Sequence, residues 1–156
     1  MLQQMLTPFL LEAGSAYLSE VRAVARHMLN QNKDTNSWNY GNTVYEANVL
    51  LGRVALREGQ ADKARACLRA AGRSPGSPQL GSFGPDLVFA RELLEHGDKA
   101  DREAVLAFLE DIAHFWANPD PRNANSQRVA ADHLKELEGW RQEIRDGKIP
   151  NHRMWR

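Results

Sequence analysis

Two stretches of this chain repeat one pattern of small and large apolar residues. In the first stretch the pattern positions are Leu51, Gly52, Ala55, Ala64, Leu68 and Ala71, with a Glu-Gly-Gln turn in the middle. In the second they are Phe89, Ala90, Leu93, Ala104 and Phe108, with a His-Gly-Asp turn in the middle. Apolar residues three and four apart mark one face of a helix. The pattern therefore predicts two antiparallel helical hairpins, an architecture used more often for binding than for catalysis.

Helical periodicity extends over nearly the whole chain. An apolar stripe with a Thr7-Pro8 cap predicts a first helix from about residue 8 to residue 30. The other predicted helices span about 38–59, 62–71, 86–96, 101–116 and 126–146. No segment is a credible strand, so we predict an all-α single domain of about six helices over residues 1–156. Its parts are an N-terminal helix and linker (1–37), two hairpins (38–116), and a C-terminal helix and tail (117–156).

Two segments leave alternatives open. Proline and glycine recur so densely in residues 74–85 that no helix is predicted there. Leu80 and Phe83 either anchor this loop in the gap between the hairpins or belong to a rigid lip over a binding groove. The tail carries Met154 and Trp155, and it either docks back on the domain, contacts a second subunit or has no fixed structure.

Composition excludes several classes of function. Twenty basic and twenty acidic residues give a formal net charge of zero, so no global field attracts nucleic acid or an anionic membrane. No stretch approaches the roughly 20 apolar residues that a membrane span requires. The apolar start, residues 1–11, lacks the basic residues and cleavage site of a signal peptide. The single cysteine, Cys67, cannot form an internal disulfide, so we expect a soluble cytoplasmic protein.

No motif supports catalysis. The five histidines are scattered, without the paired spacing of a metal site. Glu110 and His114 are four residues apart on one predicted helix face, where they form either a surface ion pair or a general-base pair. Cys67 lies among small and apolar helix residues, which indicates an inert buried thiol rather than a nucleophile. We therefore predict a protein that is not an enzyme, with no catalytic residues, cofactor or metal.

The hairpin pattern resembles that of the tetratricopeptide (TPR) family. The six pattern residues of the first stretch fall on its signature positions, and the second stretch keeps Phe89, Ala90 and Leu93. The resemblance covers about residues 43–116. It implies a short right-handed array of stacked hairpins, flanked by the predicted N- and C-terminal helices. It also implies that the first helix of each hairpin lines a concave groove.

The two predicted hairpins carry opposite charge. Residues 43–73 contain six basic and three acidic residues, whereas residues 74–116 contain three basic and eight acidic residues. Neighbouring hairpins of opposite sign attract, although an exposed ion pair contributes only about 0–1 kcal/mol. The charges are either ordinary solvated faces with incidental complementarity or a dipolar groove that orients a charged ligand.

The start of the second predicted helix is the first candidate for binding. It gathers aromatic, amide and acidic side chains, namely Trp38, Asn39, Asn42, Tyr45 and Glu46. Aromatic and amide groups stack and hydrogen-bond at little ordering cost, and aromatic residues are enriched at protein interfaces. The alternative is that Trp38 and Tyr45 are core residues, with the asparagines capping the helix.

Arginines of the implied groove are the second candidate: Arg53, Arg57 and Arg91. They either grip a carboxylate of a ligand or pair with glutamates such as Glu46, Glu92 and Glu95. From both candidates we predict a non-catalytic binding or adaptor module for a protein, a peptide or a second copy of itself. The alternative is a small-molecule-binding protein, for sequestration or sensing, with a pocket between helices; an enzyme ranks third. No nucleic-acid or membrane partner is expected.

Overall fold

Regular structure in the described chain is entirely helical. The computed structural model describes residue 14 and residues 17–156, and no strand occurs in that part. Its α-helices are α2 (Leu18–Gln31), α3 (Tyr40–Arg57), α4 (Ala61–Gly72), α5 (Pro78–Phe83), α6 (Val88–His96), α7 (Lys99–Ile112) and α8 (Ala124–Arg145). Two 3₁₀ helices are η2 (Ala113–Trp116), which follows α7, and η3 (Arg153–Trp155), which lies in the tail. The predicted all-α fold class is confirmed, with seven α-helices in the described residues.

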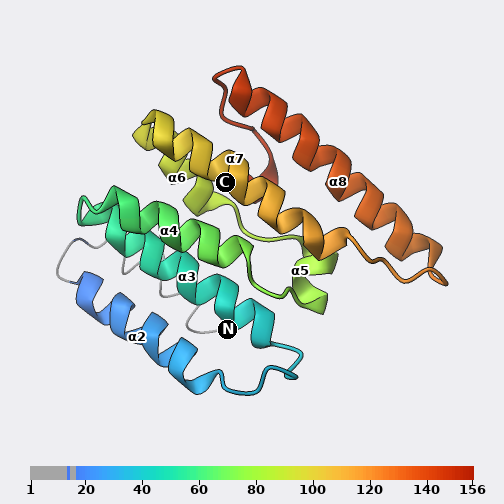
Figure 1. Ribbon diagram of the computed structural model, residues 1–156, viewed down its shortest axis with the longest axis horizontal. Helices are drawn as coiled ribbons and strands as arrows, with labels where there is room; N and C mark the ends of the chain where they lie inside the picture. Colours follow the sequence, from blue (N-terminus) through green and yellow to red (C-terminus); the bar gives the residue numbers. More distant parts are fainter. Residues whose placement is uncertain (1–13, 15–16) are drawn as a thin grey trace.

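The long helices lie side by side in the order of the chain (Figure 1). α3 packs against α4 and forms the first hairpin, and α6 packs against α7 and forms the second. The two hairpins meet where α4 contacts α7 and α3 contacts α6. α2 lies against α3 on one side of the stack, and α8 lies against α7 on the other. One continuous core of buried apolar side chains extends from α3 to the tail.

Gly52 lies at a close crossing of three helices. A Cβ atom at this position would lie 2.4 Å from the Phe89 ring of α6 and 3.0 Å from the Cβ of Cys67 on α4. Phe89 is fully buried, so its ring has no room to move away. The absence of a side chain at Gly52 therefore allows the second hairpin to pack directly on the backbone of the first.

Ion pairs join the hairpins around this crossing. Five of the six basic residues of 43–73 pair with acidic residues of the second hairpin: Arg53 and Arg57 with Glu92, Arg65 with Asp101, and Arg69 and Arg73 with Asp111. The sixth is Lys63, which lies on another face of α4 and lines a pocket. The opposite charges noted in the sequence thus meet at the contact between the hairpins.

The proline- and glycine-rich segment corrects the prediction of an irregular loop, because it contains α5. Ser77 caps this helix by accepting a hydrogen bond from the Leu80 amide (3.0 Å), and Pro78 occupies the first turn, where a missing N–H costs nothing. Gly84, with φ of 78°, ends the helix. Leu80 is buried as expected, whereas Phe83 is exposed. Proline and glycine mark the ends of this helix instead of excluding it.

The other predicted helices differ in how well their limits agree. α3, α4, α6 and α8 begin and end within two residues of the predicted limits, and α7 stops at Ile112 and continues as η2. Gly14 lies within the first predicted helix, but its φ of 106° does not occur in a right-handed helix, and α2 begins only at Leu18. Its Thr7-Pro8 cap lies outside the described residues.

The tail docks back on the domain, which decides among the three alternatives for it. Met154 and Trp155 are buried, and the Met154 carbonyl accepts a hydrogen bond from the Leu87 amide at 2.7 Å. The Trp155 ring packs edge-on against Trp140 of α8, with 5.8 Å between ring centroids. The tail thereby links α8 to the start of α6.

Gly52→Ala and Gly139→Ala should change stability in opposite directions. At Gly52 the added methyl overlaps the buried Phe89 ring, and overpacking of this kind costs about 1–3 kcal/mol. At Gly139, inside α8, nothing lies within 4 Å of the added methyl, so the higher helix propensity of alanine should stabilise by about 0.5–1 kcal/mol. Urea denaturation of both variants measures the two effects. A stabilising Gly52→Ala would show that the crossing is not closely packed.

Candidate functional site

A polar clamp ties the start of α3 to α5. The Asn42 amide nitrogen donates to the Asn39 side-chain oxygen at 2.9 Å and to the Gln79 side-chain oxygen at 2.7 Å. The Asn42 side-chain oxygen accepts from the Ser77 hydroxyl at 2.6 Å. Asn42 is buried, so these bonds satisfy an amide that water does not reach. The sequence selected Asn39 and Asn42 as binding residues, and the structure gives them this internal role.

Beside the clamp, the backbone of the first turn of α3 closely approaches the segment that leads into α5. The Ser74 hydroxyl donates to the Gly41 carbonyl at 2.6 Å, and a Cβ atom on Gly41 would lie 1.8 Å from the Gly76 carbonyl oxygen. Nε2 of His114 lies 2.7 Å from the Ser74 carbonyl oxygen on the other side. The first turn of α3 and the segment leading into α5 are therefore held together by contacts that no larger residue at position 41 would permit.

Two aromatic side chains project from the clamped segments. Trp38 is 70% exposed and Phe83 is 73% exposed, whereas the other exposed large hydrophobic residues of the described chain reach only 40–42%. Trp38 directly precedes Asn39, and Phe83 is the last residue of α5. We call the surface made by Trp38, Asn39, Gln79 and Phe83 the α3–α5 end. The alternative of a core position for Trp38 is wrong, because its indole faces solvent.

Tyr45, the second aromatic of the predicted cluster, is a core residue. Its ring lies 6.4 Å from those of Phe108 and Phe115, and its hydroxyl donates to the Asp86 carbonyl at 2.6 Å. Burial, together with the negative charge of Asp86, raises the pKa of Tyr45 well above its usual value. Tyr45 thus packs α3 against α7 and η2 and ties it to the segment that precedes α6.

The predicted groove arginines are engaged with neighbouring glutamates. Arg53 forks onto Glu92, with Nη2 donating at 2.7 Å and Nε at 3.0 Å, and Arg57 donates to the same carboxylate at 3.3 Å. Arg91 donates to Glu95 at 2.7 Å. Glu46, also in the predicted set, is half-buried on α3. The structure therefore agrees with the alternative that these arginines pair within the chain.

The turn between α6 and α7 carries the one group of potential metal ligands found in the described residues: His96, Asp98 and Asp101. Asp101 is fully buried, and its two oxygens already accept from Arg65 Nη1 and His96 Nδ1, both at 2.6 Å. Both oxygens of Asp101 are engaged, and a metal ion shared with His96 would have to break the His96–Asp101 hydrogen bond, so this arrangement is better explained as an ion-pair network. Hydrogen bonding to Asp101 raises the pKa of His96. Burial alone would raise the pKa of Asp101, but the bonds from His96 and Arg65 outweigh it and lower the pKa.

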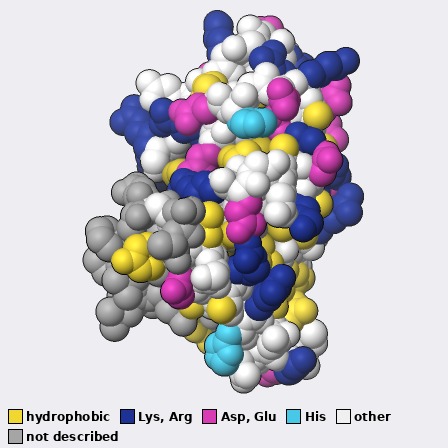
Figure 2. Space-filling model, turned by 90° about the vertical axis from the view of Figure 1, so that its left-hand side faces the viewer, with side chains coloured by type: hydrophobic (Ala, Val, Ile, Leu, Met, Phe, Trp, Pro, Cys, Tyr) yellow, Lys and Arg dark blue, Asp and Glu magenta, His cyan; other side chains and the backbone are white. Residues whose placement is uncertain are grey.

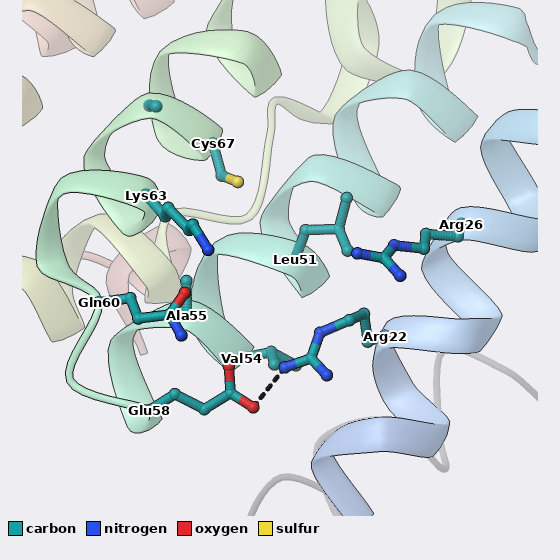
Figure 3. A pocket seen from close by; sticks show the side chains of 10 residues that line it. Arg22, Arg26, Leu51, Val54, Ala55, Glu58, Gln60, Lys63 and Cys67 are labelled. Carbon is teal, nitrogen blue, oxygen red and sulfur yellow. Dashed lines mark hydrogen bonds and ion pairs between the residues drawn. The ribbon is translucent and has the colours of Figure 1, made fainter.

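A pocket of about 650 Å³ lies between α2 and the first hairpin (Figure 3). Its lining includes Arg22 and Arg26 from α2, Leu51, Val54 and Ala55 from α3, Glu58 and Gln60 from the turn, and Lys63, Ala66 and Cys67 from α4. Glu58 forms an ion pair with Arg22. Burial raises the pKa of the Cys67 thiol, and the nearby charge of Lys63 partly offsets this effect.

The possible catalytic groups do not form a catalytic arrangement. Glu110 pairs with Arg141 of α8, and the ring nitrogens of His114 face the backbone carbonyls of Asp111 and Ser74. Cys67 is half-buried with a raised pKa, which disfavours the nucleophilic thiolate. Basic and acidic side chains are interspersed over the face seen in Figure 2.

Sequence reasoning missed the partners of Asn42. It offered a pocket between helices as the alternative function, but it selected none of the residues that line the observed pocket as binding residues. The Ser-Pro pair at residues 77–78 was a local signal for a helix start, and it would have placed Gln79 and Phe83 on α5. The pocket had no comparable signal, because Arg22 and Lys63 come from helices that are far apart in the chain.

No protein family, curated protein or solved structure matches this chain. Among the described residues, no helix combines the length and apolar character that crossing a membrane demands. The function is therefore to be inferred from the α3–α5 end and the pocket themselves.

Stability should depend on the protonation of His96. Its folded-state pKa is raised above 6.5, so its contribution is complete below about pH 6.5 and is lost as the pH rises through the folded value. Asp101 acts oppositely: its lowered pKa gives a contribution that is present above its unfolded value and lost as acid titrates the folded carboxylate. In His96→Gln the alkaline decline should disappear while the acid decline remains. Urea denaturation across pH tests this, and equal alkaline slopes in both proteins would contradict it.

Proposed function

We propose that this protein is a non-catalytic binding module that recognises a protein partner through the α3–α5 end. The observation that carries the proposal is the exposure of Trp38 and Phe83, at 70% and 73%, on segments that the Asn42 clamp joins. Large aromatic side chains in such positions are typical of binding hot spots.

The clamp makes these aromatic residues suitable for recognition. Trp and Phe each have two side-chain torsions, so burying them against a partner costs little conformational entropy. Their backbones are fixed by the hydrogen bonds of Asn42 and by the close approach of Gly41 to Gly76, so little further ordering is needed on binding. Gln79 and Asn39, beside them, supply polar groups for the rim of an interface.

We further propose that the two hairpins form a short TPR-like right-handed array flanked by α2 and α8. The glycine crossing at Gly52 and the pairing of α3 with α6 support this arrangement. In such an array Arg53, Arg57 and Arg91 lie on the side of the groove. Because they pair with Glu92 and Glu95, we assign them to holding the array together, and the partner to the α3–α5 end. We place the module in the cytoplasm, where a lone thiol stays reduced.

Removing both exposed aromatic side chains should abolish partner binding without unfolding the protein. The affinity of Trp38→Ala/Phe83→Ala for the captured partner should fall by at least about tenfold, because hot-spot truncations typically cost about 2 kcal/mol or more each. Stability should change little, since neither side chain is buried. The measurement is affinity capture followed by titration of the identified partner with purified proteins.

Ile149→Ala is the matched control, because Ile149 is an exposed hydrophobic residue beyond the C-terminal end of α8, which lies far from α5 in Figure 1. Its binding should equal that of the parent protein. Equal binding by the Trp38→Ala/Phe83→Ala variant, or equal loss in the control, would rule out the α3–α5 end as the recognition surface. If the captured partner is a second copy of this chain, the protein associates with itself, and light scattering then measures whether it forms a dimer.

A further inference from the structure

The pocket between α2 and α4 has more positive than negative charge. Arg22, Arg26 and Lys63 line it, against a single carboxylate, Glu58. Glu58 is already bonded to Arg22. Arg26 and Lys63 have no salt bridge to any described residue, and both are exposed. The two cations without a counter-ion therefore border one cavity from opposite walls, as Figure 3 shows.

Lys63 stands out among the basic residues of the first hairpin. The other five, which are arginines, all pair with the second hairpin, so their charge is neutralised within the fold. Asp62, next to Lys63, bonds to Arg65 and does not line the pocket. The N-cap of α4, Gln60, lines the pocket and makes no side-chain cap, so the positive end of the helix dipole adds to the local field.

Apolar side chains form the remainder of the pocket. Val54 and Ala55 are buried at its base, and Leu51, Ala66 and Cys67 complete the apolar lining. A volume of about 650 Å³ lies within the range of small-molecule sites. An apolar base with cations at the rim matches a ligand that has an apolar body and an anionic head.

We propose that this pocket binds a small organic anion with an apolar body, of the class of alkyl or aryl carboxylates. Arg26 and Lys63 bind the anionic head, and Leu51, Val54 and Ala55 contact the body. The site is separate from the α3–α5 end, because Glu58 is about 27 Å along the α3 axis from Tyr40. It adds a ligand-binding function to the protein-binding one and does not depend on it.

Cys67 provides a built-in reporter of occupancy. It is the chain's single cysteine and lines the pocket, so alkylation by neutral iodoacetamide reports on one position. The probe is octanoate, and the comparator is octan-1-ol, which has the same chain without charge. Protection is the ratio of alkylation rates without and with probe in the same variant. This ratio removes the change in thiol reactivity that follows from the loss of the Lys63 charge.

Octanoate should slow alkylation saturably, and octan-1-ol should protect much less. In Arg26→Gln/Lys63→Gln the half-protecting concentration of octanoate should rise by roughly tenfold or more, because two charge-assisted contacts are lost. The matched control is Arg128→Gln/Lys135→Gln, which removes the same charge from exposed positions on α8 and should change it by less than about twofold.

Three results would overturn the proposal. Absence of protection by octanoate would show that the pocket binds no such anion. Equal protection by octan-1-ol would show that the pocket binds apolar chains without recognising the charge. An equal rise of the half-protecting concentration in the control variant would show that only the net charge of the protein matters. All four substituted side chains are exposed, so the variants should fold, and circular dichroism checks that they do.

Discussion

The fold depends on the close crossing at Gly52. Because Gly52 has no side chain, the Phe89 ring packs against α3, and α6 comes near enough for Arg53, one residue further on, to reach Glu92. α4 and α7 approach closely at another glycine, Gly72, where an added Cβ would lie 2.8 Å from the Phe108 ring, and between the same two helices Arg65 reaches the buried Asp101. Burying a carboxylate is costly unless it is paired and hydrogen-bonded, and Arg65 and His96 together meet that requirement. Close packing and ion pairing at this interface therefore act as one constraint, because the short separation of the helices brings the arginines within reach of the carboxylates.

This constraint decides which charges remain for function. In the sequence, Arg53 and Arg57 are four residues apart on one helix face, as expected of ligand-binding residues. In the structure both pair with Glu92 and so join α3 to α6. Lys63 lies on a face of α4 that does not meet the second hairpin, and Arg26 lies on α2, outside the hairpins altogether. The cations available to a ligand therefore lie outside the interface between the hairpins, in the pocket between α2 and α4.

Most helices could be predicted because their signals are local. The three- and four-residue spacing of apolar side chains placed α3, α4, α6 and α8 within two residues, and Gly52 marked a helix crossing correctly. The site could be predicted only in part. Trp38 and Tyr45 are both large aromatic residues, so the sequence allows each of them a core or a surface position. Tyr45 lies on the face of α3 that meets Asp86, whereas Trp38 precedes the helix. Contacts of Asn42 with Ser77 and Gln79 join residues 35 and 37 positions apart, and no local pattern reveals them.

The two proposed sites lie at opposite ends of α3, and the surroundings of the helix differ at these ends. At its start, the side-chain amide of Asn42 is satisfied inside the protein and joins α3 to α5, and the surface beyond this clamp carries exposed aromatic rings. Nearer its end, a pocket opens between α2 and α4 over Leu51 and Val54, with cations on both walls. A rigid apolar surface suits a preformed protein interface, whereas an open cationic pocket suits a small anion. Because one rigid helix carries both, a ligand at one end has no evident means of changing the other, and the two sites are expected to bind independently.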